Sequence, residues 1–139
     1  MESILFPDPE RYRFGYTDIE MAAIYTGMDV LLHASYGEGF GVPAIEAAAC
    51  GTKVIGSNWA ASQDLVAEDG WLVDGQPFWD EAQLSFFQIP SVPSIVQALV
   101  NAYQSSRAES KTSIEFASQF DVERVWKWYW MPFLRGRLK

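Results

Sequence analysis

The stretch VLLHASYGEGFGVPAIEAAACGTKVIGS, residues 30–57, holds the pattern that decides the fold. Residues 30–34 form a short continuous apolar run, which is typical of a strand buried on both faces. A glycine-rich loop follows, and Pro43 then opens a helix that Gly51 ends. Lys53–Ser57 is a second apolar strand. Strand, helix and strand in this order predict a crossover unit of a parallel sheet.

The same alternation continues on both sides of this unit. Asp18 is a good cap for a helix that Gly27 ends, and Asp121 is a good cap for a final helix. The other expected elements are a strand over residues 70–73 and helices over residues 62–67, 93–105 and 110–119. The chain of 139 residues has no internal repeat and no linker-like tract, so we expect one domain of the α/β class.

Composition narrows the possible functions. Apolar residues make up 49% of the chain, which is enough for a packed core. Ten Lys and Arg stand against 18 Asp and Glu, and a surface with net charge −8 repels nucleic acid. Cys50 is alone, so an intrachain disulfide is excluded; we expect it to be a small buried hydrophobe. With no signal-like or membrane-spanning run, we expect a soluble cytoplasmic protein.

The loop over residues 35–41 carries the candidate chemistry. It joins the carboxyl end of a strand to a helix N-terminus, which is where open α/β sheets bind ligands and where the helix dipole favours phosphate. Its three glycines would let a ligand approach the main chain. Glu38 and Glu46 would place two carboxylates near one cleft, where each could accept hydrogen bonds from a sugar or ribose diol. The other interpretation is a tight turn with two solvated glutamates.

Glu38-Gly39-Phe40-Gly41, with Glu46 eight positions after Glu38, resembles the Glu-x7-Glu region of retaining GT-B glycosyltransferases of the group 1 type. The resemblance covers about residues 14–73 and continues more loosely into the later helices. It implies a Rossmann-like parallel sheet with flanking helices, the second half of a GT-B C-terminal domain. Residues 1–139 would then be a partial nucleotide-sugar-binding domain with a C-terminal aromatic helix at residues 121–134.

The resemblance also implies roles for individual residues. Glu38, assigned to the catalytic site, would contact hydroxyls of the donor sugar as a positioning group, and Glu46 would bind the ribose hydroxyls. Tyr16 lies where the family's main chain touches the base. Main-chain amides of four residues would hold the sugar and the diphosphate: Gly39, Phe40, Gly41 and Val42. The donor would be a UDP-, GDP- or ADP-sugar, transferred with retention to an acceptor hydroxyl, with no metal and no cofactor.

The chain also departs from the family pattern. It lacks the Arg and Lys that neutralise the diphosphate, and Lys53 is the only cation between Phe14 and Ser106. The resemblance does not extend to the family's N-terminal acceptor domain, so we expect a missing domain or partner chain, self-association and no turnover by the isolated chain. The alternatives are a non-catalytic nucleotide-sugar-binding module that pairs with another chain, and a plain interaction domain.

Aromatic residues crowd the final helix and the segment over residues 75–89, which is longer than the family's usual connection. The final helix is apolar nearly all round, so it is either buried within this domain or docked onto a missing partner half. Arg135 and Arg137 could pair with anionic lipid, but they also complement a helix C-terminus, and we expect no membrane contact. His33 is interpreted as a core or strand-end residue.

Overall fold

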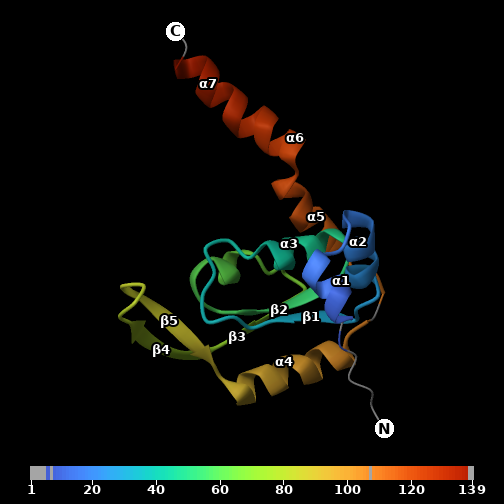
Figure 1. Ribbon diagram of the computed structural model, residues 1–139, viewed down its shortest axis with the longest axis vertical. Helices are drawn as coiled ribbons and strands as arrows, with labels where there is room; N and C mark the ends of the chain where they lie inside the picture. Colours follow the sequence, from blue (N-terminus) through green and yellow to red (C-terminus); the bar gives the residue numbers. More distant parts are fainter. Residues whose placement is uncertain (1–5, 7, 107, 138–139) are drawn as a thin grey trace.

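The computed structural model describes residues 6, 8–106 and 108–137. Its centre is a three-stranded parallel sheet in the order β1 (Val30–His33), β2 (Lys53–Ser57) and β3 (Trp71–Val73), shown in Figure 1. Leu32 pairs with Ile55 across the first two strands, and Ile55 pairs with Trp71 across the last two. The expected α/β class with a parallel sheet and flanking helices is confirmed.

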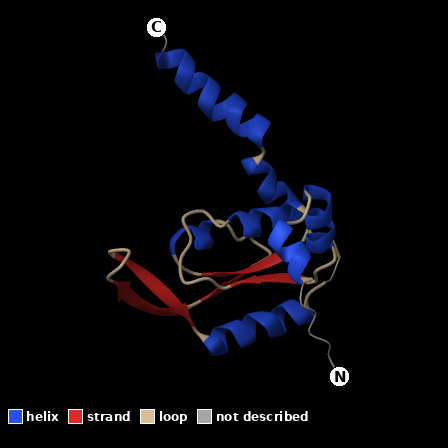
Figure 2. Cartoon of the chain, viewed as in Figure 1, coloured by secondary structure: helices blue, strands red, loops and turns tan. Residues whose placement is uncertain are grey.

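Helices cover both faces of this sheet (Figure 2). On one face, α2 (Asp18–Thr26) and α3 (Val42–Ala49) pack with Val54 of β2. On the other, α4 (Val92–Gln104) packs with Ile55 of the same strand. Successive residues of a strand point to opposite faces, so Val54 and Ile55 belong to two different apolar clusters, one on each face of the sheet.

The remaining elements lie around this core. They are α1 (Pro9–Phe14), the 3-10 turn η1 (Ala60–Asp64), β4 (Gly75–Asp80), β5 (Ser85–Pro90), α5 (Lys111–Ala117), the 3-10 turn η2 (Ser118–Phe120), α6 (Val122–Val125), the π-helical turn η3 (Trp126–Trp130) and α7 (Met131–Arg137). No helix among the described residues combines the length and apolar character needed to cross a membrane.

Two helix starts differ from the expectation. The cap of α2 is Thr17 and not Asp18, because Thr17 and Glu20 form a capping box: the Thr17 hydroxyl accepts from the Glu20 N–H, and Glu20 Oε2 accepts from the Thr17 N–H at 2.9 Å. These bonds from Thr17 also lower the pKa of the Glu20 carboxyl. The short helix expected over residues 62–67 is instead the 3-10 turn η1, which begins two residues earlier.

Strand β1 is not buried on both faces. It is an edge strand, and Leu32 is 45% exposed. The physical reason is the position of α4, which packs over β2 and β3 and leaves part of β1 uncovered among the described residues. Proteins normally cover an exposed apolar edge strand of this kind with a helix, a loop or another chain.

The aromatic segment over residues 75–89 is not a loop. It forms an antiparallel hairpin of β4 and β5, with Phe78 opposite Phe87 and Trp79 opposite Phe86. The dipeptides typical of two-residue hairpin turns are absent, and Pro77 argues against a strand. The sequence pattern therefore did not predict the hairpin. An edge position in a two-stranded sheet tolerates that proline.

The final helix begins after Asp121, as expected, since the Asp121 side chain caps the Arg124 N–H at 3.0 Å. It continues through the π-helical turn to Arg137, beyond the expected end, and projects away from the body of the protein (Figure 1). Trp128 is 65% exposed and Tyr129 is 69% exposed. The interpretation of this helix as buried within the domain is therefore wrong.

Candidate functional site

The glycine-rich loop lies at the carboxyl end of β1 and leads into α3. Gly41 caps this helix in a left-handed conformation, with φ of 95°, that other residues rarely adopt. A Cβ on Gly37 would lie 2.9 Å from the Phe87 ring, so this glycine is required by packing. Of the three glycines in the loop, only Gly39 has open space, because a Cβ there would meet no atom within 4 Å. The close approach of a ligand to the main chain is therefore best accommodated at Gly39.

Main-chain donors gather at the same place. The N–H groups of residues 39–41 donate no hydrogen bond within the described part of the chain, and the N–H of Val42, the first residue of α3, has no acceptor within its helix. Pro43 has no N–H, and the Ala44 N–H donates to Gly41 O at 3.1 Å. No free first-turn amide therefore follows Val42 before Ile45. The free donors precede Pro43.

Glu38 contacts the end of strand β1. His33 Nε2 lies 3.3 Å from Glu38 Oε1, and both side chains are partly buried. The aliphatic part of Glu38 lies against Gly41, at the N-terminus of α3. His33 is the last residue of β1, so its interpretation as a strand-end residue is confirmed. Its contact with Glu38 spans the loop, and no sequence pattern indicated it.

Glu46 is held by a tyrosine from the neighbouring helix. The hydroxyl of Tyr25, a buried residue of α2, donates to Glu46 Oε2 at 2.9 Å. Burial, together with this hydrogen bond, raises the pKa of Tyr25 to about 12, so the phenol stays protonated and remains a donor. Thr52 in turn donates to the main-chain oxygen of Tyr25 at 2.6 Å. Sequence reasoning missed Tyr25, which precedes Glu46 by 21 positions.

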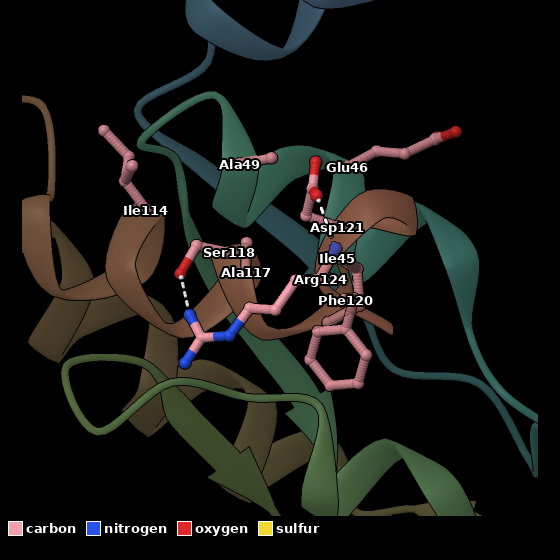
Figure 3. Close-up of a pocket in the computed structure, with 9 residues that line it drawn as sticks. All are labelled: Ile45, Glu46, Ala49, Ile114, Ala117, Ser118, Phe120, Asp121 and Arg124. Carbon is pink, nitrogen blue, oxygen red and sulfur yellow. Dashed lines mark hydrogen bonds between the residues drawn. The ribbon is translucent and has the colours of Figure 1, made fainter. Parts of the chain in front are cut away.

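Glu46 also borders a cavity of about 540 Å³ between α3 and the segment from α5 to α6. Figure 3 shows its side chain extending away from the Arg124 guanidinium, which donates to Ser118 Oγ at 3.1 Å. A second cavity of about 260 Å³ joins Glu46 to Tyr25 and Asp18. Neither cavity includes Glu38. The structure thus does not unite the two glutamates in either of them.

Two aromatic residues named from the sequence have clear neighbours. The Phe40 ring meets Phe120 edge to face, with centroids 5.5 Å apart, which connects the glycine-rich loop to η2. The Arg11 guanidinium lies over the Tyr16 ring at 5.7 Å from its centroid. Phe120 and Arg124, in the C-terminal region, border the site region and were not expected from the sequence.

Positive charge is scarce around the loop. Lys53 is the first residue of β2, so it lies at the amino end of the sheet, opposite the loop. Its Nζ lies 3.4 Å from Ser106 O and 5.8 Å from the centre of the Trp71 ring. No group of three or more potential metal-ligating side chains occurs among the described residues. The loop itself therefore offers a phosphate only main-chain dipoles, while Arg124, which donates to Ser118, borders the cavity next to Glu46.

Comparisons with known proteins agree on one family. A family model described as "Glycosyl transferases group 1" matches residues 10–84. D-inositol 3-phosphate glycosyltransferase of Rhodococcus opacus is 46% identical over 57 residues, which cover 40% of this chain and 13% of that protein. MMP alpha-(1->4)-mannosyltransferase of Mycolicibacterium hassiacum is 39% identical over 56 residues, or 40% of this chain and 14% of that protein.

A solved structure shares the fold. One chain of the GtfA/B complex superposes with a TM-score of 0.65 and 23% identity, over 84% of this chain and 22% of its own length. The present chain thus corresponds to only a small part of the relatives and of the structural neighbour that it matches.

Proposed function

This chain belongs to the group 1 glycosyl transferases, and on that premise we propose that it is the donor-binding part of a retaining glycosyltransferase. The donor would be a UDP-, GDP- or ADP-sugar, and the sugar would pass to an acceptor hydroxyl without a metal or a cofactor. The observation that carries the proposal is the open main chain at Gly39, beside free N–H groups at the start of α3.

The chemistry required of this site is electrostatic. As the diphosphate leaves, negative charge develops on its oxygens, and fixed main-chain N–H groups with the N-terminus of α3 would stabilise it. Glu38, held beside His33, would orient hydroxyls of the donor sugar. Glu46 would accept from the ribose hydroxyls with the oxygen atoms that Tyr25 leaves available, since a carboxylate has about four acceptor sites.

The rest of the machinery would come from another domain or chain. Main-chain dipoles at one helix end supply only about half a unit charge. Lys53 lies at the amino end of the sheet, opposite the glycine-rich loop. We propose that an acceptor domain, or a partner chain, supplies the acceptor site and the cations that neutralise the diphosphate. We also propose that the protein acts in the cytoplasm. The exposed aromatic helix over residues 122–137 would pack against that domain or chain.

A substitution in the open space at Gly39 tests the proposal. The Cβ of Gly39→Val would meet no atom within 4 Å beyond its chain neighbours, so the melting temperature should change little while nucleotide-sugar affinity falls at least about tenfold. Gly136→Val is the matched control, because Gly136 also faces open space and lies far along the final helix. Calorimetric titration with UDP-, GDP- and ADP-sugars measures both.

Equal affinity of wild type and Gly39→Val for the sugar nucleotide that binds best would contradict this placement of the donor. Failure of all three donor classes to bind wild type would contradict the donor-binding function itself.

A further inference from the structure

Glu46 lies about one helical turn from the free N–H groups at the start of α3. It follows Val42 by four positions, so the two residues share one face of the helix. Val42 is 52% exposed and Glu46 is exposed as well, so this face is open to solvent. Because helical side chains tilt toward the N-terminus of their helix, the Glu46 side chain leaves α3 toward the end where the diphosphate would bind.

The Glu46 carboxylate is only partly used within the chain. Among the described residues its one hydrogen-bond donor is the Tyr25 hydroxyl, which lies 2.9 Å from Oε2. A carboxylate has about four acceptor sites, so about three stay available for a ligand. Two neighbouring hydroxyls of a ribose would need two of them.

Tyr25 itself is held in place from several sides. Its side chain is 5% exposed and belongs to the apolar cluster that contains Ala44 and Ala47 of α3. The Thr52 hydroxyl donates to its main-chain oxygen, which connects α2 to the start of β2. The phenol is therefore a rigid donor, and the flexible, exposed Glu46 side chain is fixed by it.

Arg124 would be a competing partner for Glu46. The two residues border the same cavity of about 540 Å³, and a guanidinium forms a strong two-point pair with a carboxylate. Instead, Arg124 Nη1 donates to Ser118 Oγ, and Figure 3 shows the Glu46 side chain extending away from the guanidinium. The bond from Tyr25 thus keeps the Glu46 carboxylate apart from this cation and open to a ligand.

We propose that Tyr25 is a positioning residue for the donor: its hydroxyl fixes the Glu46 carboxylate so that two acceptor sites meet the 2′- and 3′-hydroxyls of the ribose. The site is thereby specific for a ribose that carries both hydroxyls, because an analogue without them leaves the positioned carboxylate unpaired. This inference rests on the proposed function, in which Glu46 binds the ribose.

The ratio of two affinities tests the role of Tyr25. Calorimetric titration of the whole chain with UDP, GDP and ADP, and with their 2′,3′-dideoxy forms, gives this ratio for the base that binds best. Wild type should bind the ribose form at least about tenfold more tightly. Tyr25→Phe removes only the hydroxyl and should reduce the ratio to about twofold, while the affinity for the dideoxy form stays within about twofold of wild type.

Two further variants separate positioning from stability. Ile55→Val weakens the packing of β2 on α4, on the face of the sheet opposite α3, and should leave the ratio within about twofold of wild type. Glu46→Gln should lower the ratio by itself. Adding Tyr25→Phe to it should cause no further loss, because the hydroxyl acts through that carboxylate.

Three results would overturn the role of Tyr25 while leaving donor binding intact. They are an unchanged ratio in Tyr25→Phe, an equal fall of the ratio in Ile55→Val, and a further loss when Tyr25→Phe is added to Glu46→Gln. Equal binding of the ribose and dideoxy forms by wild type would also overturn it, since no ribose contact would exist to be positioned. Failure of wild type to bind any of the nucleotides would instead contradict the donor-binding function itself.

Discussion

The sheet with α3 and the final helix use apolar residues in opposite ways. Ala47 and Ala48 of α3 and Ile55 of β2 have no exposed surface, so this region completes its packing within the chain. The helix over residues 122–137 carries three tryptophans, each about half exposed or more, and it projects into solvent. The first region is a closed packing unit, whereas the second has the composition of a surface that another protein surface covers.

The largest effect should separate the two regions by stability. Ile55→Ala removes a fully buried side chain between β2 and α4 and should lower the free energy of unfolding by about 2–5 kcal/mol. Trp128→Ala should change it by no more than about 0.5 kcal/mol, because that ring is largely in water already. Urea unfolding measures both. If Trp128→Ala lowered the free energy of unfolding as much as Ile55→Ala, the two regions would not differ in how they use apolar residues.

A second effect concerns binding within the first region. Glu46→Gln should weaken nucleotide binding by about 1.5–3 kcal/mol, because a charge-assisted pair with the ribose would be lost. Glu38→Gln should cost less, since its proposed contact is with the sugar and not with the nucleotide. Calorimetry with UDP and GDP gives both values. Equal losses, or no loss in Glu46→Gln, would refute the assignment of Glu46.

The alkaline limit of the first region should depend on Tyr25. Its folded pKa of about 12 exceeds the ordinary value of 10.0. The stability from its protonated phenol is therefore fully present below pH 10 and is lost as the pH rises toward 12. Tyr25→Phe should be less stable at neutral pH, and this difference from wild type should shrink above pH 10. A difference that stays constant from pH 8 to about pH 12 would contradict the buried contact with Glu46.

The smallest effect should be self-association through the second region. Exposed aromatic residues on an uncovered helix should pair weakly between copies of the isolated chain, and Trp126→Ser with Trp130→Ser should weaken that pairing about tenfold. Sedimentation velocity over a range of concentrations measures the change. A wild-type chain that stays monomeric at high concentration would contradict self-association through this helix.

Local signals in the sequence were sufficient for the first region and insufficient elsewhere. The apolar runs of β1 and β2, with Pro43 and Gly51 at the ends of α3, predicted the crossover unit because each signal acts within a few residues. The cap at Thr17 was missed because the adjacent Asp18 is an equally good cap by residue type, and only the bond to Glu20 distinguishes them.

Longer-range features had no such signal. The Tyr25–Glu46 hydrogen bond joins residues 21 positions apart, and the packing of Phe87 on Gly37 joins a hairpin to a loop 50 positions earlier. Gly37 and Gly39 look alike in the sequence, yet the first is needed for packing and the second faces open space. Contacts of this kind follow from the fold and could not be read from residue spacing.

The most direct test of the central claim is a transfer assay on the isolated chain. The purified chain is incubated with radiolabelled UDP-, GDP- and ADP-sugars and with a panel of acceptors. We expect a donor to bind and no sugar to be transferred or hydrolysed, because the glycine-rich loop over residues 35–41 offers the leaving diphosphate main-chain dipoles and no cationic side chain. Transfer or hydrolysis that Glu38→Ala abolishes would contradict the claim that this chain is only the donor-binding part of the enzyme.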